Sequence, residues 1–382
     1  MQARKPKILI MIPAGKRYQH DRVMIYDQAR DDYIRSYFNT GDMMVYDSIL
    51  KLLDFADMDV LKIANPTEAD IERYNSSFDY VLLRGSNFIH EHMQWERAAW
   101  VLEQLKIPIY AIGVGAQAET KRHIALSPEN RRVWELIAER SKAVGVRGAY
   151  SAEVLAANGV KNVEVIGCPS LFRRRNRNML LNLKPARAIK RVAFSLRRET
   201  NHYYAANMST FVSRQRELLL KIADSYETTI TIHGEPQEKA FFVGHREGIA
   251  AATEAFKKSG WFDPEHEERM LHLYRHDLFL NDRVEDYDHM ITQHDFAIGY
   301  RVHGILPALA NGIPGSLVDY DTRSGELAET FSIPNALDAD ILNAPLDQVF
   351  DPSQFGDFIK NFGRNYDRFK GYLDRSDIPN RM

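Results

Sequence analysis

The chain has 382 residues, of which 45% are hydrophobic and 27% are charged, as in ordinary soluble globular proteins. Its formal net charge of -2 gives no electrostatic reason to expect nucleic acid as a partner. The single cysteine, Cys168, excludes an internal disulfide and favours a reducing compartment.

The apolar run at 7–12 is too short for the core of a signal peptide, and no stretch approaches the roughly 20 apolar residues that cross a bilayer. We therefore expect a cytoplasmic protein. Location at the inner face of the membrane stays open as an alternative, because the basic stretch 173–191 could make peripheral contact with anionic lipid.

In the first half of the chain, apolar runs typical of buried parallel strands alternate with amphipathic segments typical of helices. The expected strands are 7–12, 78–83, 107–112, 143–146 and 163–166. The expected helices are 42–55, a short one from Thr67, one that includes Phe88 and Leu102, 128–140, and one closed by Asn158-Gly159. Asp42 is the expected cap of the first helix, and residues 13–40 are expected to form a long surface excursion before it.

The stretch 173–191 interrupts this alternation with eight Arg or Lys residues and Pro185, and is predicted to be a solvated interdomain linker. Strands are then expected at 192–196, 229–232, 295–300 and 315–320, with helices at 208–225 and from His303, and a polar helical region at 237–290. The last predicted helix, 352–373, has an apolar face that consists of Phe355, Phe358, Ile359, Phe362, Tyr366 and Phe369.

Alternating strands and helices predict an α/β protein with parallel sheets and right-handed crossovers. A chain of this length exceeds one ordinary core, so we expect two Rossmann-like domains whose sheets face an interdomain cleft. The expected boundaries are 1–175 and 188–348. Residues 350–382 are expected to pack back onto the first domain.

Cationic side chains follow several of the predicted strands. Arg84, Arg147 and Arg301 come directly after apolar runs, Arg197 follows Leu196 in the same way, and His233 follows Ile232. The carboxyl ends of parallel strands meet at one edge of a sheet, where ligands bind. Several arginines in one cleft repel one another unless an anionic ligand is present, and guanidinium groups suit carboxylate and phosphate. In Arg301-Val302-His303, both side chains stand where a helix begins, so an anion is also favoured by the helix amino end.

Other motifs carry weaker signals. Gly113, Gly115 and Ala118 have the spacing of a dinucleotide fingerprint, but they follow a late strand and the next strand ends at Arg147 rather than at an acidic residue. This argues against NAD, although close backbone approach to a ligand stays possible in this loop. No metal site is expected, because neither His90 with His92 nor His272 with His276 has a third ligand. Cys168 is expected to be a small buried residue rather than a nucleophile.

An ordered set of motifs resembles the polysaccharide pyruvyl transferase family across roughly 40 to 330. The matching segments are Asn39-Thr40-Gly41-Asp42, 112–117 with Gln117 at its end, 146–151, 165–170, 300–304 with Gly304 at its end, and 318–323. The family resembles two-domain GT-B transferases, and its members move pyruvate from phosphoenolpyruvate onto a sugar as a ketal. The departures are the insert at 13–40, Cys168 where the family tends to have Asp, and Arg323 where it tends to have Lys.

The resemblance implies that phosphoenolpyruvate is the donor substrate, with no cofactor or metal, and that a saccharide or lipid-linked saccharide is the acceptor. Our hypothesis is that Arg301, Arg147, Arg323 and the backbone at Gly304 hold the donor, that His303 is the general acid, and that Asp42 orients or deprotonates a sugar hydroxyl. The first domain would be the acceptor side and the second the donor side. Other expected cleft-lining residues are Gly41, Arg84, Gly113, Gly115, Gln117, Arg197 and His233.

Two alternatives stay open at this point. A glycosyltransferase of the same fold would also need arginines and a helix amino end for a nucleotide diphosphate, and a non-catalytic module could bind acidic saccharides. Assembly into a homo-oligomer is not decided by the sequence.

Overall fold

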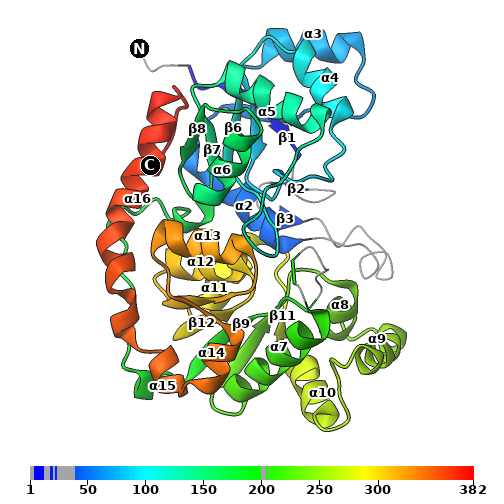
Figure 1. Ribbon diagram of the computed structural model, residues 1–382, viewed down its shortest axis with the longest axis vertical. Helices are drawn as coiled ribbons and strands as arrows, with labels where there is room; N and C mark the ends of the chain where they lie inside the picture. Colours follow the sequence, from blue (N-terminus) through cyan, green and yellow to red (C-terminus); the bar gives the residue numbers. More distant parts are fainter. Residues whose placement is uncertain (1–3, 13–17, 20–21, 24–38, 199–203, 206) are drawn as a thin grey trace.

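Two parallel sheets organise the molecule (Figure 1). The computed structural model describes residues 4–12, 18–19, 22–23, 39–198, 204–205 and 207–382. Within these ranges each sheet has six strands, and every pairing between neighbouring strands in the two sheets is parallel. The predicted α/β class with two Rossmann-like domains is confirmed.

The N-terminal sheet has the strand order β4-β1-β5-β6-β7-β8. Its strands are β1 (Lys7–Met11), β4 (Asp57–Val60), β5 (Tyr80–Arg84), β6 (Ile109–Val114), β7 (Val144–Val146) and β8 (Val163–Val165). The helices of this half are α2 (Thr40–Leu52), α3 (Glu68–Ser77), α4 (Glu96–Gln104), α5 (Pro128–Arg140) and α6 (Ala149–Ala157). The two-residue strands β2 (Tyr18–Gln19) and β3 (Arg22–Val23) pair with each other in antiparallel fashion.

The C-terminal sheet has the order β11-β10-β9-β12-β13-β14. Its strands are β9 (Arg191–Ser195), β10 (Glu227–Thr231), β11 (Leu278–Phe279), β12 (Phe296–Gly299), β13 (Gly315–Asp319) and β14 (Asn335–Leu337). Its helices are α7 (Met208–Ala223), α8 (Pro236–Phe242), α9 (Arg246–Lys258), α10 (Glu267–His276), α11 (Val284–Ile291), α12 (Val302–Ala310), α13 (Thr322–Phe331), α14 (Asp338–Asn343) and α15 (Leu346–Val349).

Local sequence signals set several element boundaries as predicted. Ser127 caps α5 by accepting a hydrogen bond from the Asn130 backbone N–H, with Pro128 at the first helical position. Gly159 adopts a left-handed conformation with φ of 91° just after α6, as a helix-terminating glycine does.

Other boundaries differ from the prediction. Asn39, not Asp42, caps α2, because its side chain accepts from the Gly41 backbone N–H and Asp42 lies inside the first turn. Phe88 lies before α4 rather than on it. The strands β4, β11 and β14 were not expected. All three are short and lie at sheet edges, where burial does not impose an apolar pattern.

The C-terminal helix α16 (Gly356–Arg375) runs along both halves (Figure 1). A short 3-10 helix, Pro352–Phe355, precedes it on the second half, where Phe355 contacts Phe296 of β12. At its far end the Tyr372 hydroxyl donates to the backbone carbonyl of Ala143, at 2.9 Å, in the N-terminal half. The predicted apolar face is wrong at Ile359, whose side chain is 46% exposed, whereas the other five predicted side chains are buried.

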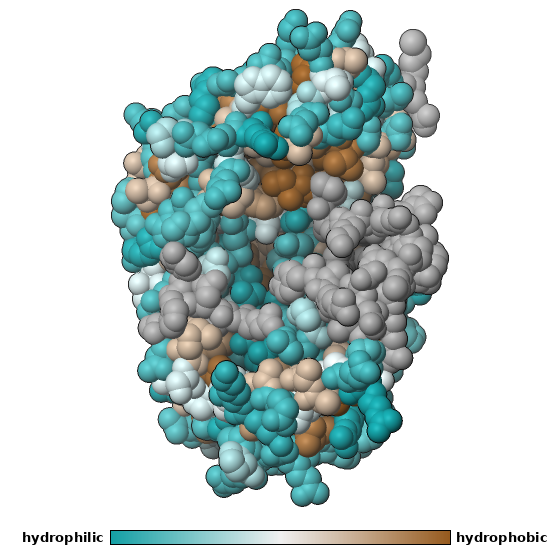
Figure 2. Space-filling view, turned by 90° about the vertical axis from the view of Figure 1, so that its right-hand side faces the viewer, coloured by the Kyte–Doolittle hydropathy of each residue, from teal (hydrophilic) through white to brown (hydrophobic). Residues whose placement is uncertain are grey.

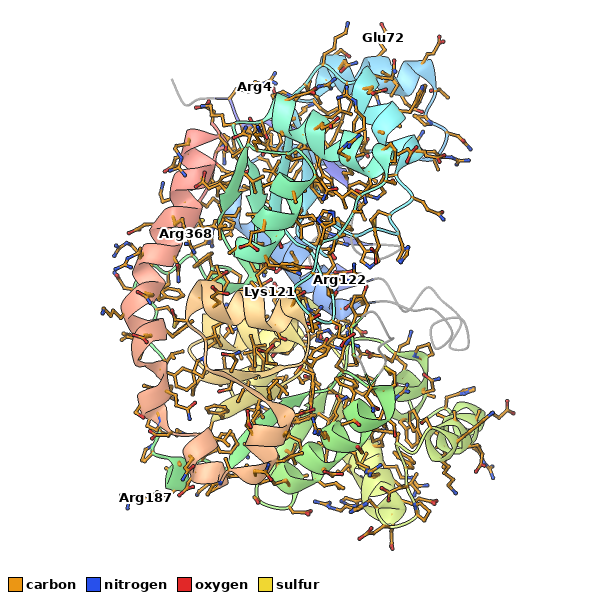
Figure 3. All side chains as sticks on the ribbon, viewed as in Figure 1. Arg4, Glu72, Lys121, Arg122, Arg187 and Arg368 are labelled. Atoms are coloured by element: carbon orange, nitrogen blue, oxygen red, sulfur yellow. The ribbon has the colours of Figure 1, made fainter. Side chains whose placement is uncertain are left out.

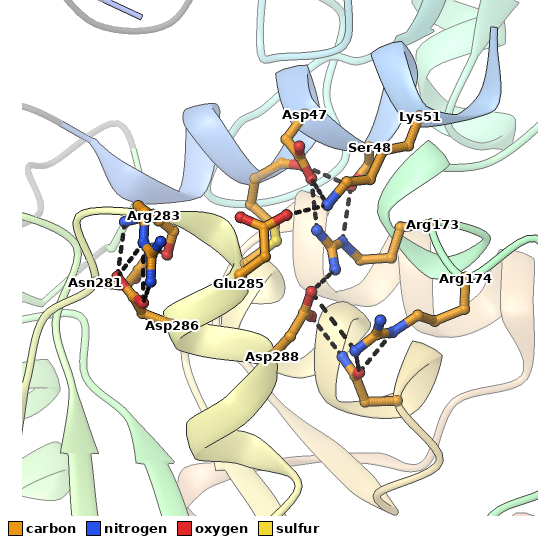
Figure 4. A network of polar contacts seen from close by, with 12 residues as sticks. Asp47, Ser48, Lys51, Arg173, Arg174, Asn281, Arg283, Glu285, Asp286 and Asp288 are labelled. Atoms are coloured by element: carbon orange, nitrogen blue, oxygen red, sulfur yellow. Dashed lines mark hydrogen bonds and ion pairs between the residues drawn. The ribbon is translucent and has the colours of Figure 1, made fainter. Parts of the chain in front are cut away.

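The basic segment 173–191 is not the solvated linker that its composition suggested. Arg173 is buried and forms ion pairs with Asp47 of α2, at 2.5 Å, and with Asp288 of α11 (Figure 4). Lys51 of α2 joins the same network through Asp47, at 3.2 Å, and also pairs with Glu285 of α11, at 2.6 Å. The network therefore ties a helix of the N-terminal half to a helix of the C-terminal half.

Several other basic residues of this segment are also paired with acidic side chains within the molecule, among them Arg177 with Asp367 and Lys184 with Asp295. Arg187 is exposed at the end of the C-terminal half that lies farthest from the N-terminal sheet (Figure 3). In the part of the chain that the structure describes, no helix combines the length and the apolar character needed to cross a membrane.

Candidate active site

A polar cavity of about 180 Å³ lies where the strands of the two sheets point toward each other. Figure 2 shows a hydrophilic hollow between the two halves. Its lining residues come from the amino end of α2, the loops after strands of both sheets, and the amino ends of α12 and α13. They are Asn39, Asp42, Val45, Gly85, Ser86, Asn87, Gly113, Gln117, Arg147, Cys168, Arg197, Tyr204, His233, Arg301, Val302, His303, Arg323 and Leu327.

The strand β12 delivers Arg301 and His303 to this cavity. It ends at Gly299, whose φ of 152° and close approach to the Ser195 backbone leave no room for a Cβ atom. Arg301 is the residue before α12, and His303 lies in the first turn of that helix. Gly304 does not line the cavity, because it packs against the Ser195 side chain of the neighbouring strand β9.

Two of the predicted arginines are held by internal partners. The Arg301 guanidinium donates through Nε to the Leu196 carbonyl at 2.9 Å and pairs with Glu235. Arg147 pairs with Glu326 of α13, with its Nε 2.9 Å from Oε2, and also donates to the side chain of Asn87. Both arginines line the cavity, but carboxylates already offset much of their charge.

Arg84 is also held internally. Its Nε donates to the Ile12 carbonyl at 2.8 Å, its Nη1 donates to the Gly85 carbonyl at 3.1 Å, and it is not among the lining residues. Its Nη1 lies 3.5 Å from Oδ1 of Asp42, so it contributes to the site through that carboxylate.

Among the described arginines that line the cavity, Arg197 and Arg323 are the two with an unsatisfied buried donor. The Nε atom of each is buried without a hydrogen-bond partner in the described ranges of the chain. Arg323 donates through Nη2 to the Tyr320 hydroxyl at 2.9 Å, and its nearest carboxylate, that of Asp321, is 3.9 Å away. A buried donor without a partner is costly, so these two groups are placed to bind a polar or anionic ligand.

His303 and His233 are neutral bases in this environment. Burial, reinforced by the charges of Arg323, Arg147, Arg84 and Arg301, lowers the pKa of His303 well below its usual range. Burial and the charge of Arg301 lower the pKa of His233 in the same way, with smaller effects from His303, Arg197 and Arg323. The electrostatic field that disfavours an imidazolium here also favours an anion in the cavity.

Asp42 faces the cavity from the N-terminal half. Its Oδ1 accepts a hydrogen bond from the Ser86 hydroxyl at 3.2 Å, and its side chain is 32% exposed. The first turn of α2 is also bonded to the other half, since the backbone N–H of Thr40 donates to the His233 carbonyl at 3.0 Å. The structure therefore brings Asp42 and His303 to the same cavity from opposite domains.

Of the three other glycines predicted to line the cleft, one lines the cavity and two lie behind its wall. Gly113 lines the cavity with Gln117, whose Nε2 donates to Asp321 at 2.6 Å. Gly41 and Gly115 do not line it. A side chain at Gly41 would collide with the His233 ring, and one at Gly115 would collide with the Arg147 guanidinium, so both permit close packing behind the wall.

Comparison with known proteins decides the family. The family model described as polysaccharide pyruvyl transferase matches residues 39–322. The chain belongs to this family. The match covers most of the chain, including every strand-end loop that lines the cavity, so the protein is a transferase of polysaccharide biosynthesis.

A comparison with curated proteins finds none that matches the sequence of this family member. Solved structures with a similar fold include a Listeria monocytogenes protein assigned as a UDP-N-acetylglucosamine 2-epimerase (12% identity, 97% of this chain and 96% of that chain, TM-score 0.48). A second is S. aureus MnaA with UDP (13% identity, 97% of this chain and 96% of that chain, TM-score 0.46). A third is UDP-GlcNAc 2-epimerase from Neisseria meningitidis bound to UDP-GlcNAc (11% identity, 97% of this chain and 100% of that chain, TM-score 0.45).

Several residues in and around this cavity were not identified from sequence. Glu326 lies one helical turn after Arg323, and its carboxylate accepts from the Ser151 backbone N–H at 2.6 Å as well as pairing with Arg147. Glu235 follows His233 by two residues, a spacing that could have drawn attention to it. Asn87 and Tyr204 line the cavity from loops whose composition carries no distinctive signal.

The histidine pairs noted in the sequence do not line the cavity, although the His90 ring lies 6.4 Å from that of Tyr204, which does. His90 and His92 contact each other, with ring centroids 5.2 Å apart, as do His272 and His276, at 4.7 Å. Among the residues that the structure describes, no group of three His, Cys, Asp or Glu side chains could hold a metal ion.

Proposed function

We propose that the protein transfers pyruvate from phosphoenolpyruvate to two hydroxyls of a saccharide, forming a pyruvate ketal and releasing inorganic phosphate. The observation that carries this proposal is the pairing of two incompletely satisfied guanidinium groups, Arg197 and Arg323, with the buried imidazole of His303 in one small cavity. Phosphoenolpyruvate carries a carboxylate and a phosphate on a small frame, and guanidinium groups with unsatisfied donors in one small cavity suit these two anionic groups.

His303 would protonate the methylene carbon of the donor. Its imidazole is neutral before a donor binds, because burial and four arginines oppose a further positive charge. A bound donor brings negative charge to the same place, which favours the imidazolium form and so raises the pKa of His303. Donor binding would thus load the acid with its proton at the time when the proton is needed.

Protonation leaves an electron-poor central carbon that carries the carboxylate and the phosphate. One sugar hydroxyl attacks this carbon and loses its proton, with Asp42 placed to orient the hydroxyl or accept that proton. The carbon–oxygen bond to phosphate then breaks, and the second hydroxyl attacks to close the ketal. The two hydroxyl protons balance the one consumed at the methylene and the one that leaves with phosphate.

The test is incubation of the purified protein with phosphoenolpyruvate and a panel of mono-, di- and lipid-linked saccharides. We expect acceptor-dependent phosphate release and a saccharide whose mass increases by one pyruvyl ketal. His303→Ala should abolish turnover and retain donor binding. Product formed from nucleotide sugars instead would establish a glycosyltransferase, and saccharide binding without turnover of either donor would establish a binding module.

A further inference from the structure

One buried thiol of the cavity wall has no part in the mechanism above. Cys168 follows β8, is 3% exposed, and lines the cavity beside His303. Its Sγ lies 3.7 Å from Nε2 of His303, within hydrogen-bonding range for sulfur. This is the one hydrogen bond of the His303 ring with any residue in the described ranges, so Nδ1 is left available to a ligand.

We infer that Cys168 is a positioning residue for His303, donating its S–H to Nε2 and thereby holding the proton of the neutral imidazole on Nδ1. The expected effect of Cys168 on turnover rests on the proposed function, whereas its expected effect on the His303 tautomer in the resting protein does not. A neutral imidazole has one N–H, and the hydrogen bond made by one ring nitrogen decides which nitrogen carries it.

The thiol is well suited to remain a donor. Burial raises the pKa of Cys168, against smaller opposing effects from hydrogen bonding with Ser170 and from the charge of Arg147. The imidazole is correspondingly weak as a base toward solvent protons, because burial lowers the pKa of His303. Both partners are therefore uncharged near neutral pH, and the thiol keeps a proton that it can donate to Nε2.

The arrangement directs proton transfer toward the substrate. If Nε2 carried the proton of the neutral ring, that N–H would point at the sulfur, and Nδ1 would meet the donor as an acceptor until the ring gains its second proton. With Nδ1 protonated, the N–H belongs to the ring nitrogen that makes no hydrogen bond with any described residue. The same cavity holds the unpaired Nε of Arg323, whose side chain is 9% exposed, so a ligand meets both groups together.

The direct test is the tautomer of His303, read from the ring nitrogen chemical shifts of the full-length protein labelled with ¹⁵N-histidine, at a pH where the imidazole is neutral. His303→Gln assigns the signals. We expect Nδ1–H in the parent protein, loss of this preference in Cys168→Ala, and its recovery in Cys168→Ser, whose hydroxyl is also a donor. An Nε2–H tautomer in the parent, or an unchanged tautomer in Cys168→Ala, overturns the inference whether or not the protein turns over phosphoenolpyruvate.

Turnover provides the second readout. Cys168→Ala should lower kcat about tenfold or more, within the range that general acid catalysis contributes, with KM for phosphoenolpyruvate changed by less than about twofold. Cys168→Ser should recover most of kcat. Equal kcat in the parent and in Cys168→Ala contradicts the inference, as does a loss confined to KM. Failure of the parent to release phosphate from phosphoenolpyruvate contradicts the proposed function instead, and the tautomer measurement still stands.

Discussion

At the scale of single residues, the lowered pKa values of His303 and His233 link folding to pH. A histidine whose pKa is lower in the folded protein binds fewer protons there than in the unfolded chain once the pH falls below about 6.5. The free energy of unfolding must then fall as the pH falls, by up to about 1.4 kcal/mol per pH unit for each such group. Above about pH 7 both states are neutral at these positions and the effect disappears.

We therefore expect the free energy of unfolding, measured by urea denaturation between about pH 5.5 and 7.5, to decrease toward the acid end. His303→Gln and His233→Gln should each make this decrease less steep. The exposed His123 offers a matched control, and His123→Gln should leave the slope as in the parent. A parent protein whose stability is constant over this range would contradict the argument.

Arg323 provides a second prediction at this scale. Its buried Nε has no partner in the described ranges of the molecule, so a bound anion would gain a charge-assisted hydrogen bond there. Arg323→Gln should weaken phosphoenolpyruvate binding by about 1.5–3 kcal/mol, which is roughly 10- to 150-fold in Kd. Isothermal titration calorimetry measures this change.

Arg174→Gln is the control, because Arg174 is half-exposed and bonded to Asn311 away from the cavity. Equal donor affinity in the two variants would remove Arg323 from the donor site. Arg147 and Arg301 stay predicted donor ligands, but their loss would also leave Glu326 or Glu235 buried without its cation, so their variants would report stability as well as affinity.

At the scale of elements, α16 stabilises the fold through the apolar face that the sequence predicted. Phe362 is 4% exposed, and its ring contacts those of Phe172 and Phe358. Phe362→Ala should lower the free energy of unfolding by about 3–5 kcal/mol, as expected for deletion of a buried aromatic ring. Ile359→Ala, three residues away on the exposed side, should lower it by less than about 0.5 kcal/mol. Similar losses in both variants, measured by urea denaturation, would show that this face of α16 is not packed.

The elements that could be predicted from sequence are those whose burial requires a regular pattern of apolar residues. Central strands such as β1 and β12 are buried on both sides, so their sequences are apolar runs. The loops that follow these strands lie at the edge of the sheet where ligands bind. The strand β4 has the sequence Asp-Met-Asp-Val and was missed, because an edge strand has no such requirement. The cations at strand ends could be recognised because they directly follow strands whose apolar runs are visible in the sequence.

The partners of those cations could not be predicted. Arg147 and Glu326 are separated by 179 residues, and only the docking of one domain on the other brings them together. Arg173 was read as part of a solvated linker because its neighbours in sequence are basic and polar. Its burial depends on Asp47 and Asp288, which lie on helices of different halves. Pairing across a domain interface leaves no periodic signal in either sequence segment.

At the scale of the whole molecule, the same pairing should make the two halves unfold together. Arg173 links α2, whose first turn carries Asp42, to α11. Asp288 of α11 also accepts from Asn311, at 2.7 Å, at the end of α12, the helix whose first turn carries His303. One buried network thus fixes the relative position of the helices that carry the two proposed catalytic groups.

Arg173→Ala should remove the buried guanidinium that lies between Asp47 and Asp288 and leave them the longer pairs with Lys51, at 3.2 Å, and Arg174, at 3.7 Å, at a cost of about 3–5 kcal/mol. We expect scanning calorimetry to show one transition for the parent protein, and a lower Tm with the transition broadened or split for this variant, because the halves lose their shared network. Arg174→Ala removes the adjacent charge, whose side chain is 49% exposed, and should cost less than about 1 kcal/mol. If Arg173→Ala unfolds at the Tm of Arg174→Ala in a single sharp transition, the network does not couple the halves, and the relative position of Asp42 and His303 is set by the remaining contacts of the interface.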